Sequence, residues 1–358
     1  MSQKFYTIKV KDVQKTTADA TVVSFDVPEK LKEQFLYSHG QHLTFIKDID
    51  GEQLRRSYSL CSSPLENEWK VAVRQVEDGR FSTYVNTQLK AGDSLEVMPP
   101  HGRFFCAIDK KKAKRYVAFA AGSGITPILS IIKTHLAEEE NSSFSLFYQN
   151  RKVQTIMLRE EVEGLKNRYL GRFELYHLLT REERDAPLFN GRLNPEKLAE
   201  INKKIMDFYE VDEFFLCGPS ELIFMLQDYF INLGINKKNI HFELFDTPTN
   251  KSGKRHKAKP IVPSEDLTKV TIISNGTTMS FEMKQDGESV LDAALRHNAD
   301  LPFACKGGVC STCRAKVIEG EVDMEVNYAL EEDEVENGYV LTCQSIPKTK
   351  HIIVDYDS

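Results

Sequence analysis

The spacing of apolar residues divides the chain into segments of different character. Residues 1–106 carry short runs in which apolar and polar positions alternate, such as Phe5-Tyr-Thr-Ile-Lys-Val and Trp69-Lys-Val-Ala-Val-Arg. Turn sequences such as Asp50-Gly51 and Asp78-Gly79 separate these runs. Alternation with a period of two, interrupted by such turns, predicts antiparallel strands in a barrel or a sandwich.

Residues 107–245 show longer apolar segments that alternate with helical patterns. The expected strands are Tyr116–Ala121, Phe144–Tyr148, Phe173–Leu179, Phe214–Cys217 and Ile240–Phe245. The expected helices between them are Ile128–Glu139, Ile156–Arg168, Glu196–Ile205 and Glu221–Leu233. Strands and helices in this alternation predict a doubly wound α/β domain with a parallel sheet.

A polar segment and an acidic segment complete the chain. Residues 246–267 hold three prolines, one glycine and a run of cations, which predicts a linker. Residues 268–358 carry 8 Lys and Arg against 16 Asp and Glu, although the whole chain has a net charge of only −6. The acidic run Glu331–Glu336 is interpreted either as a solvated face or as a surface that steers toward a basic partner.

Composition excludes several classes of protein. No apolar run approaches the roughly 20 residues needed to span a bilayer, so no membrane partner is expected. The N-terminal residues Met1-Ser-Gln-Lys-Phe-Tyr lack the apolar core of a signal peptide, and the cytoplasm is the expected compartment. An acidic chain without a basic, aromatic-rich domain argues against nucleic-acid binding.

Four of the seven cysteines follow the pattern C-x4-C-x2-C-x29-C, and they are Cys305, Cys310, Cys313 and Cys343. This spacing matches the plant-type ligand set of a [2Fe–2S] cluster. Structural zinc is the alternative, but it favours paired Cys-x2-Cys units and only one such pair is present. Sparse cysteines in odd number argue against a disulfide framework, and Cys61 and Cys106 are expected to be ordinary buried thiols.

Two further motifs suggest nucleotide sites. Gly122-Ser-Gly124-Ile-Thr126 joins an expected strand to an expected helix, where glycines and free N–H groups suit a pyrophosphate, or form only a tight turn. Cys217-Gly218 ends a later strand and is expected to face the same cleft, unless it is simply a strand end of small residues. Arg56-Ser-Tyr58-Ser59 places a cation and an aromatic on one face of a strand, which suits a flavin nucleotide or an ordinary exposed strand.

Taken in order, these motifs resemble a known family. Arg-x-Tyr-Ser, Gly-Ser-Gly-Ile-Thr-Pro and Cys-Gly-Pro are similar to motifs of ferredoxin–NADP reductase relatives. Cys-Lys-Gly-Gly-Val-Cys-Ser-Thr-Cys-Arg and Leu-Thr-Cys-Gln resemble plant-type ferredoxins. Fused in this order, they resemble the reductase components of phenylacetyl-CoA epoxidases over nearly the whole chain.

The resemblance implies a multidomain fold with four segments. Residues 1–106 would be an FAD-binding antiparallel β-barrel, and residues 107–245 a NAD(P)-binding α/β domain with a doubly wound parallel sheet. Residues 246–267 would be the linker. Residues 268–358 would be an α+β, β-grasp-like [2Fe–2S] ferredoxin domain.

The resemblance also implies roles at the flavin. Arg56 would bind the flavin phosphate, Tyr58 would stack on the isoalloxazine ring, and Ser59 would hydrogen-bond near its reactive nitrogen. A segment similar to the one that holds the FAD pyrophosphate favours FAD over FMN, and its residues are Gly79, Phe81, Ser82 and Thr83.

Roles at the nicotinamide nucleotide follow in the same way. Gly122, Gly124 and Thr126 would cradle the pyrophosphate. Cys217, followed by Gly218, would lie near the nicotinamide ring, and Glu243 would lie near the site of hydride transfer.

A final pair of residues bears on which nicotinamide nucleotide is used. Thr180 and Arg181 resemble the pair that holds the 2′-phosphate of NADPH. No acidic residue follows the Phe173–Leu179 strand immediately, although Glu182 and Glu183 come soon after. NADPH is therefore expected in preference to NADH.

The implied function is an NADPH-dependent reductase that passes electrons through FAD and the [2Fe–2S] cluster to an oxygenase component. The expected oxygenase is the phenylacetyl-CoA epoxidase of phenylacetate degradation. A Rieske-type or other aromatic-ring oxygenase is the alternative partner. A non-catalytic redox sensor or scaffold is the alternative from another class of protein.

Overall fold

The computed structural model describes residues 4–245, 264–285 and 287–358. They fall into two compact units, Tyr6–Phe245 and Asp246–Ser358, the second together with residues 1–5. Most of the expected linker, residues 246–263, lies outside the described residues. Residues 264–267 were expected to be linker but belong to a strand of the second unit.

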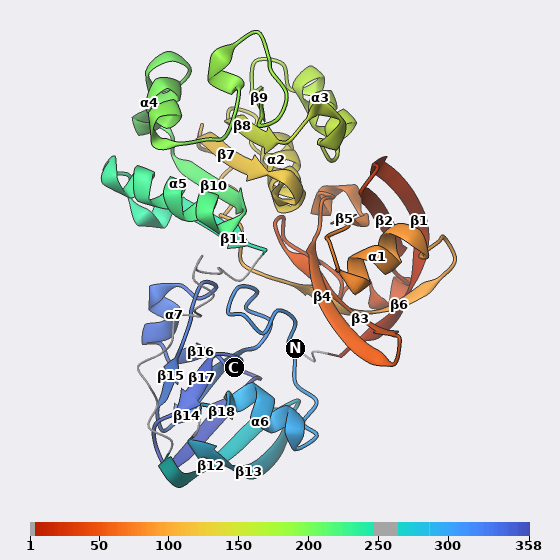
Figure 1. The fold of residues 1–358 in the computed structure, drawn as a ribbon, viewed down its shortest axis with the longest axis vertical. Coiled ribbons are helices and arrows are strands. Elements are labelled where there is room, and N and C mark those ends of the chain that lie inside the picture. The colour runs from red at the N-terminus through yellow and green to blue at the C-terminus, as the bar shows by residue number, and fades with distance from the viewer. Residues whose placement is uncertain (1–3, 246–263, 286) are drawn as a thin grey trace. The chain divides into compact units, whose positions relative to one another are not determined.

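An antiparallel barrel forms the first part of the first unit (Figure 1). Its six strands are β1 (Tyr6–Thr17), β2 (Ala20–Asp26), β3 (His42–Ile49), β4 (Glu52–Ser59), β5 (Trp69–Arg74) and β6 (Ser94–His101). They pair in the order β4-β3-β6-β1-β2-β5, and a bridge between Leu60 and Val71 joins the two ends of the sheet. Asp50 and Gly51 both have positive φ in the β3–β4 turn, as a tight hairpin requires. One helix, α1 (Arg80–Thr87), contributes Phe81 and Val85 to the barrel core.

A parallel sheet with helices on both faces forms the second part of this unit. Its strands are β7 (Arg115–Ala121), β8 (Ser143–Asn150), β9 (Phe173–Leu179), β10 (Glu213–Gly218) and β11 (Ile240–Leu244), in the order β11-β10-β7-β8-β9. Its helices are α2 (Ile125–Glu138), α3 (Arg159–Arg168), α4 (Pro195–Lys204) and α5 (Ser220–Asn232). The strand order reverses between β7 and β10, so the carboxyl ends of these strands form a topological switch point, where α/β sheets bind ligands.

Side-chain alternation along β7 explains the two helical layers. Tyr116 and Ala118 belong to a core that includes the apolar face of α2. Phe119 points to the other face, where its ring lies 5.6 Å from that of Phe230 on α5. All five expected strands and four expected helices are present. Residues 156–158 precede α3 instead of opening it, because Leu158 has a left-handed φ of 55°.

The second unit is a mixed sheet that packs against one helix. Its main sheet has the order β13-β12-β18-β14-β16, with β12 and β18 parallel and the other pairs antiparallel. The strands are β12 (Ser264–Ser274), β13 (Thr277–Gln285), β14 (Arg314–Glu319), β16 (Tyr339–Leu341) and β18 (His351–Asp355). A small second sheet pairs β15 (Val322–Met324) with β17 (Ser345–Pro347), and the helices are α6 (Val290–Arg296) and α7 (Glu332–Glu336). The apolar side chains of α6 share a core with those of β12, as in the β-grasp-like arrangement expected.

A buried polar network lies at the end of α2, where His135 Nε2 is 3.7 Å from Cys106 Sγ at the end of the barrel segment. The Glu139 carboxylate accepts hydrogen bonds from Tyr116 Oη (2.8 Å to Oε2) and from the Asp109 N–H (2.8 Å to Oε1). His135 Nδ1 lies 3.3 Å from the same Oε1, and both side chains are fully buried. Burial alone would raise the pKa of Glu139, but the hydrogen bonds outweigh it and lower the pKa from 4.5 to about 2.

Replacing this carboxylate should destabilise the first unit in a pH-dependent way. A folded-state pKa below the unfolded value adds stability that is fully present above pH 4.5 and is lost as the pH falls toward 2. Glu139→Gln should therefore lower the free energy of unfolding by about 2 kcal/mol at neutral pH, with a difference that shrinks in acid. Denaturant unfolding followed by the fluorescence of the single tryptophan, Trp69, measures this.

The neighbouring Glu140 provides the matched control because its side chain is exposed. Glu140→Gln should leave the unfolding curve unchanged at every pH. Equal curves for the two variants would show that the buried carboxylate does not stabilise the first unit.

Candidate functional site

The candidate flavin residues lie on β4 and beside it. Arg56 is exposed, and Tyr58, two positions on, is half-buried with its ring 5.9 Å from that of Phe81 on α1. Ser57, between them, bonds instead to Thr44 Oγ1 at 2.8 Å. The strand therefore presents a cation and an aromatic ring at alternate positions, the arrangement that suits a phosphate and a planar ring.

The turn before α1 is shaped by Gly79. A Cβ at this position would lie 2.3 Å from Val76 Cγ2 and 2.5 Å from Ser82 Oγ, so any larger residue would displace these two side chains. Ser82 Oγ donates to the Gly79 carbonyl at 2.9 Å and accepts from the Val76 N–H at 3.2 Å. Ser82 thus holds the turn by its side chain. Thr83 Oγ1 accepts a bond from Gln75 Nε2 at 3.3 Å. The backbone N–H groups of the first turn of α1 are what this segment offers to a phosphate.

The candidate pyrophosphate turn is a 3-10 turn, η3 (Gly122–Gly124), between β7 and α2. Gly122 has a φ of 55°, and its carbonyl accepts a hydrogen bond from Tyr148 Oη at 3.0 Å. A Cβ on Gly124 would lie 2.1 Å from the Cys217 carbonyl oxygen, and one on Gly218 would lie 3.0 Å from Ala121 Cβ. The two small-residue motifs therefore touch at the carboxyl ends of β7 and β10, as expected for one nucleotide cleft.

Thr126 and Arg74 complete this turn. Thr126 is buried, and its Oγ1 donates to the Ser123 carbonyl at 3.1 Å, so its side chain braces the start of α2. Arg74 ends β5, and its Nη1 lies 3.2 Å from where a Cβ on Gly122 would stand. Arg74 Nε is held by Asp19 Oδ2 at 2.8 Å. Sequence reasoning missed Arg74, although a cation at a strand end is a usable signal.

Ser59 and Glu243 meet across the two parts of the first unit. Ser59 Oγ, at the end of β4, donates to Glu243 Oε2 on β11 at 3.0 Å. Glu243 pairs in register with Cys217, which is fully buried on β10. Burial raises the pKa of Glu243 to about 8, and the hydrogen bond from Ser59 opposes this only in part. The structure thus brings together three of the four predicted catalytic residues around one protonatable carboxyl group.

His42 also belongs to this cluster, and sequence reasoning missed it. It opens β3 opposite Ser59, is 4% exposed, and places Nδ1 3.9 Å from Glu243 Oε1. Burial and the nearby His101 lower the pKa of His42 to about 3, so its imidazole is neutral at physiological pH. A single histidine inside an alternating strand carries no distinctive sequence signal.

Thr180 and Arg181 lie just beyond β9, at the same edge of the sheet as the glycine turn. Their N–H groups donate to the carbonyls of Asn150 and Arg151, each at 2.9 Å, which sets Arg181 beside Arg151. Both arginine side chains are exposed. The Glu182 carboxylate accepts a hydrogen bond from the Val153 N–H at 3.0 Å, so this acidic group stabilises the turn that begins at Val153.

The four candidate cluster ligands lie together in the second unit as two thiol pairs. Cys310 hydrogen-bonds to Cys305 and, with the Gly307 N–H at 3.3 Å, lowers the pKa of Cys305 to about 6. Cys313 hydrogen-bonds to Cys343 and lowers its pKa in the same way. The loop between them adopts left-handed φ at Lys306, Gly308 and Ser311, as a tight wrap requires.

This donor set fits a [2Fe–2S] cluster better than a single metal ion. Such a cluster takes two thiolates at each of its irons, and the thiols occur here as two pairs. Cys61 and Cys106 are buried elsewhere, as expected.

The acidic run near the cluster is only partly a solvated surface. Glu334 is 5% exposed, and its Oε1 accepts from Arg314 Nε at 2.9 Å. Its other oxygen accepts from the Glu331 N–H at 3.2 Å and so caps α7. One carboxylate of the run therefore stabilises the fold, which sequence alone did not reveal.

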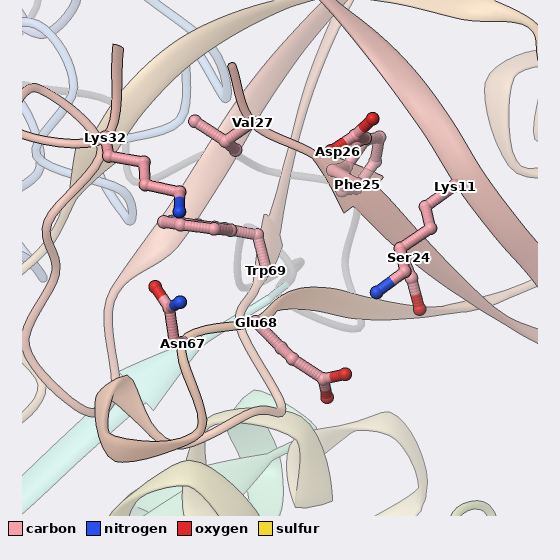
Figure 2. Close-up of a pocket in the computed structure, with 9 residues that line it drawn as sticks. All are labelled: Lys11, Ser24, Phe25, Asp26, Val27, Lys32, Asn67, Glu68 and Trp69. Atoms are coloured by element: carbon pink, nitrogen blue, oxygen red, sulfur yellow. The ribbon is translucent and has the colours of Figure 1, made fainter. Parts of the chain in front are cut away.

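A small cavity of about 190 Å³ lies on the barrel wall (Figure 2). Its lining includes Lys11, Lys32, Asn67 and Trp69, and none of the candidate residues. It is therefore separate from the candidate flavin and nucleotide sites. Along the described stretches of chain, no helix is both long enough and apolar enough to cross a membrane.

Three protein families match successive parts of the chain. Residues 7–106 match the oxidoreductase FAD-binding domain, and residues 119–228 the oxidoreductase NAD-binding domain. Residues 272–348 match the 2Fe-2S iron-sulfur cluster binding domain. The fold and these sites define an NAD(P)H-dependent oxidoreductase with FAD and a [2Fe–2S] cluster.

Similar proteins extend this match to the full length. The chain is 44% identical over 354 residues to a component of the 1,2-phenylacetyl-CoA epoxidase of Escherichia coli (strain K12), covering 99% of this chain and 98% of the relative. It is 30% identical over 361 residues to the ferredoxin reductase component of 3-ketosteroid-9-alpha-monooxygenase from Rhodococcus rhodochrous, covering 98% and 96%. The chain belongs to the ferredoxin–NADP reductase family, in the group with a C-terminal plant-type [2Fe–2S] ferredoxin domain.

A solved structure shows the same fold. Phthalate dioxygenase reductase, described as a modular structure for electron transfer from pyridine nucleotides to [2Fe–2S], aligns with a TM-score of 0.57 at 23% identity. The alignment covers 98% of each chain. The multidomain architecture expected from the sequence is confirmed.

A side chain at Gly124 should damage nucleotide binding selectively. Gly124→Ala places a methyl group against the Cys217 carbonyl, so the turn must move away from β10. The dissociation constant for the nicotinamide nucleotide should rise at least about tenfold, or roughly 1.4 kcal/mol, with unchanged flavin content. Equilibrium titration of the purified protein measures both quantities.

Gly164→Ala is the matched control, since Gly164 lies in α3 with nothing within 4 Å of an added Cβ. It should bind nucleotide like the parent protein. Unchanged binding by Gly124→Ala would rule out the η3 turn as the pyrophosphate site.

Proposed function

We propose that this protein is the reductase component of a phenylacetyl-CoA epoxidase, delivering electrons from NADPH to the oxygenase component. The observation that carries the proposal is the contact of Ser59 with Glu243, beside Cys217, in a chain that also holds two thiol pairs. The full-length identity with the Escherichia coli epoxidase component supports the choice of partner. When bound, FAD converts a two-electron hydride donor into single electrons and a [2Fe–2S] cluster carries them one at a time.

The barrel residues bind and orient the flavin nucleotide. Arg56 is exposed and positioned to pair with a phosphate. Tyr58, supported from behind by Phe81, offers a ring face for stacking. Ser59 would lie near the reactive nitrogen of the flavin, with its hydroxyl group bonded to Glu243. The N–H groups after Gly79 would bind the pyrophosphate of FAD.

The α/β residues bind and orient NADPH. The glycines of η3 let the backbone approach the pyrophosphate, and Arg74 adds a positive charge from the barrel side. Cys217 and Gly218 would lie near the nicotinamide ring. Their small size admits a planar ring beside Glu243.

Arg181 and Thr180 select the phosphorylated nucleotide. The 2′-phosphate of NADPH adds a dianion that an exposed arginine pair can hold, and Arg151 stands beside Arg181. The Glu182 carboxylate accepts a hydrogen bond from the Val153 N–H at 3.0 Å, in the turn beyond Arg151.

The cluster ligands form the exit for electrons. Cys305 is exposed, whereas Cys313 and Cys343 are buried, so the loop at Cys305 and Lys306 is the part of the site nearest to solvent. A partner protein that docks over this loop has the shortest path for electrons.

Removing one cluster ligand should separate the two halves of the activity. Cys310→Ser should abolish NADPH-dependent product formation by the reconstituted epoxidase oxygenase. Reduction of ferricyanide by NADPH should stay within about twofold of the parent protein, because the Tyr6–Phe245 unit holds the flavin and nucleotide sites independently. Parallel assays with each acceptor measure the split.

Cys61→Ser is the control, because Cys61 lies in the barrel and hydrogen-bonds to the Lys70 carbonyl at 3.4 Å, a bond that serine retains. It should support both reactions. Activity of the parent protein with a Rieske-type oxygenase but not with the epoxidase would replace the proposed partner, and absence of ferricyanide reduction would indicate a non-catalytic protein.

Charge removal at Arg181 should change nucleotide preference. Arg181→Ala should raise the KM for NADPH about tenfold and leave the KM for NADH nearly unchanged, since only NADPH carries the 2′-phosphate. Steady-state ferricyanide reduction with both nucleotides measures the ratio. Arg168→Ala, at the C-terminal end of α3, is the control and should alter neither KM. An equal rise for both nucleotides in Arg181→Ala would refute the 2′-phosphate role.

A further inference from the structure

The His42 imidazole lies behind the Ser59–Glu243 pair with one nitrogen facing it. Its Nδ1 is 3.9 Å from Glu243 Oε1, whereas Ser59 bonds to the other carboxyl oxygen, Oε2. Its Nε2 is buried and has no hydrogen-bond partner among the described residues. A buried polar atom without a hydrogen-bond partner lowers the stability of the fold. A histidine that keeps such an atom is therefore a candidate for a functional role.

The next group beyond His42 is another histidine. His101, at the end of β6, pairs in register with His42, and the two ring centroids lie 6.1 Å apart. His101 is partly exposed, whereas His42 and Ser59 are buried. Ser59, Glu243, His42 and His101 therefore form a succession of proton-bearing groups that ends at a partly exposed ring.

The proposed reaction requires such a path because of its proton balance. Oxidation of NADPH yields NADP⁺, one proton and two electrons, and the cluster accepts electrons only. The proton that arrived with the hydride must therefore leave the buried site each time both electrons have been passed on. The hydroxyl group of Ser59 and the carboxyl group of Glu243 lie at the inner end of the exit.

We propose that His42 relays this proton from Glu243 toward His101 and the solvent. The inference rests on the proposed function. Glu243 gives its proton to Nδ1 of His42 while it takes one from Ser59, and His42 releases its other proton from Nε2. Ser59 regains its proton from the one that arrived with the hydride, and every other group regains its original protonation when the His42 ring returns to its first tautomer.

Charge and burial support this assignment. The pKa of Glu243 is raised to about 8 and that of His42 is lowered to about 3, each mainly by burial, so both are electrically neutral at rest near neutral pH. The ionisable groups beside them are His101 on β6 and Cys217 on β10. The gap of 3.9 Å must shorten by roughly 1 Å for transfer, a tightening that catalytic hydrogen bonds commonly undergo when ligands bind.

Stopped-flow proton release tests the relay in the full-length holoprotein. The protein is reduced anaerobically with NADPH and then oxidised with ferricyanide in weak buffer, and a pH-indicator dye reports the proton. His42→Gln should slow proton release at least about tenfold, while flavin bleaching by NADPH stays within about twofold. Release in the variant should recover with added imidazole and show a larger solvent deuterium isotope effect than in the parent protein.

His39→Gln is the matched control, because His39 is also a buried barrel histidine but binds the Cys106 carbonyl through Nε2 at 3.2 Å. It should release protons at the parental rate. His101→Gln is the second test variant and should also slow release, which keeps the proposal testable if His42→Gln fails to fold.

Infrared difference spectra provide a readout independent of turnover. The carboxyl C=O band that Glu243→Gln removes should shift in His42→Gln, because its neighbour has changed. Parental rates of proton release in both His42→Gln and His101→Gln would overturn the relay and leave the proposed function intact. Failure of NADPH to bleach the flavin in the parent protein would instead overturn the proposed function.

Discussion

The hydrogen bond between Ser59 and Glu243 is the contact on which the arrangement of the first unit depends. It links the last residue of a barrel strand to a strand of the parallel sheet, 184 positions further along the chain. Both side chains are largely removed from solvent, and this burial raises the pKa of the Glu243 carboxyl group, whereas the bond from Ser59 lowers it in part. A flavin bound by the barrel and a nucleotide bound by the parallel sheet can react only if the end of β4 lies against the sheet. The bond between Ser59 and Glu243 is a point at which β4 and β11 are in contact.

Backbone contact reinforces the same meeting point. Gly124 lies so close to the Cys217 carbonyl that no side chain fits, and Arg74 reaches from the barrel to Gly122. At the opposite end of α2, His135 of the buried Glu139 network contacts the barrel segment through Cys106 Sγ, 3.7 Å from its Nε2. Two separated sets of polar contacts resist rotation of one part against the other better than a single set could.

The second unit depends on how its fold positions four cysteine thiols. Its chemistry depends on four thiols, and the fold supplies them as two pairs drawn from one loop and from a distant segment beyond β16. Thr342 ties these regions by donating its hydroxyl group to the Cys313 carbonyl at 3.0 Å. Tyr356 Oη lies 2.7 Å from the same hydroxyl, so the end of the chain supports the ligand pair.

The sequence by itself determined the class of fold and the motifs. The alternation of apolar and polar residues, the glycine turns and the cysteine spacing are local patterns that can be recognised without the structure. It therefore predicted the five strands of the parallel sheet, the antiparallel strands of the first part as a class, the η3 turn and the four thiols. Only the tertiary structure decided which of these residues serve the fold and which remain available. Ser82, Glu182 and Glu334 are engaged with neighbouring groups. Arg74 and His42 lie at the candidate site, and of these two only Arg74, a cation at a strand end, has a local signal in the sequence. The physical reason is that burial and pairing depend on segments far apart in the chain, and these set the charge and the orientation of each side chain.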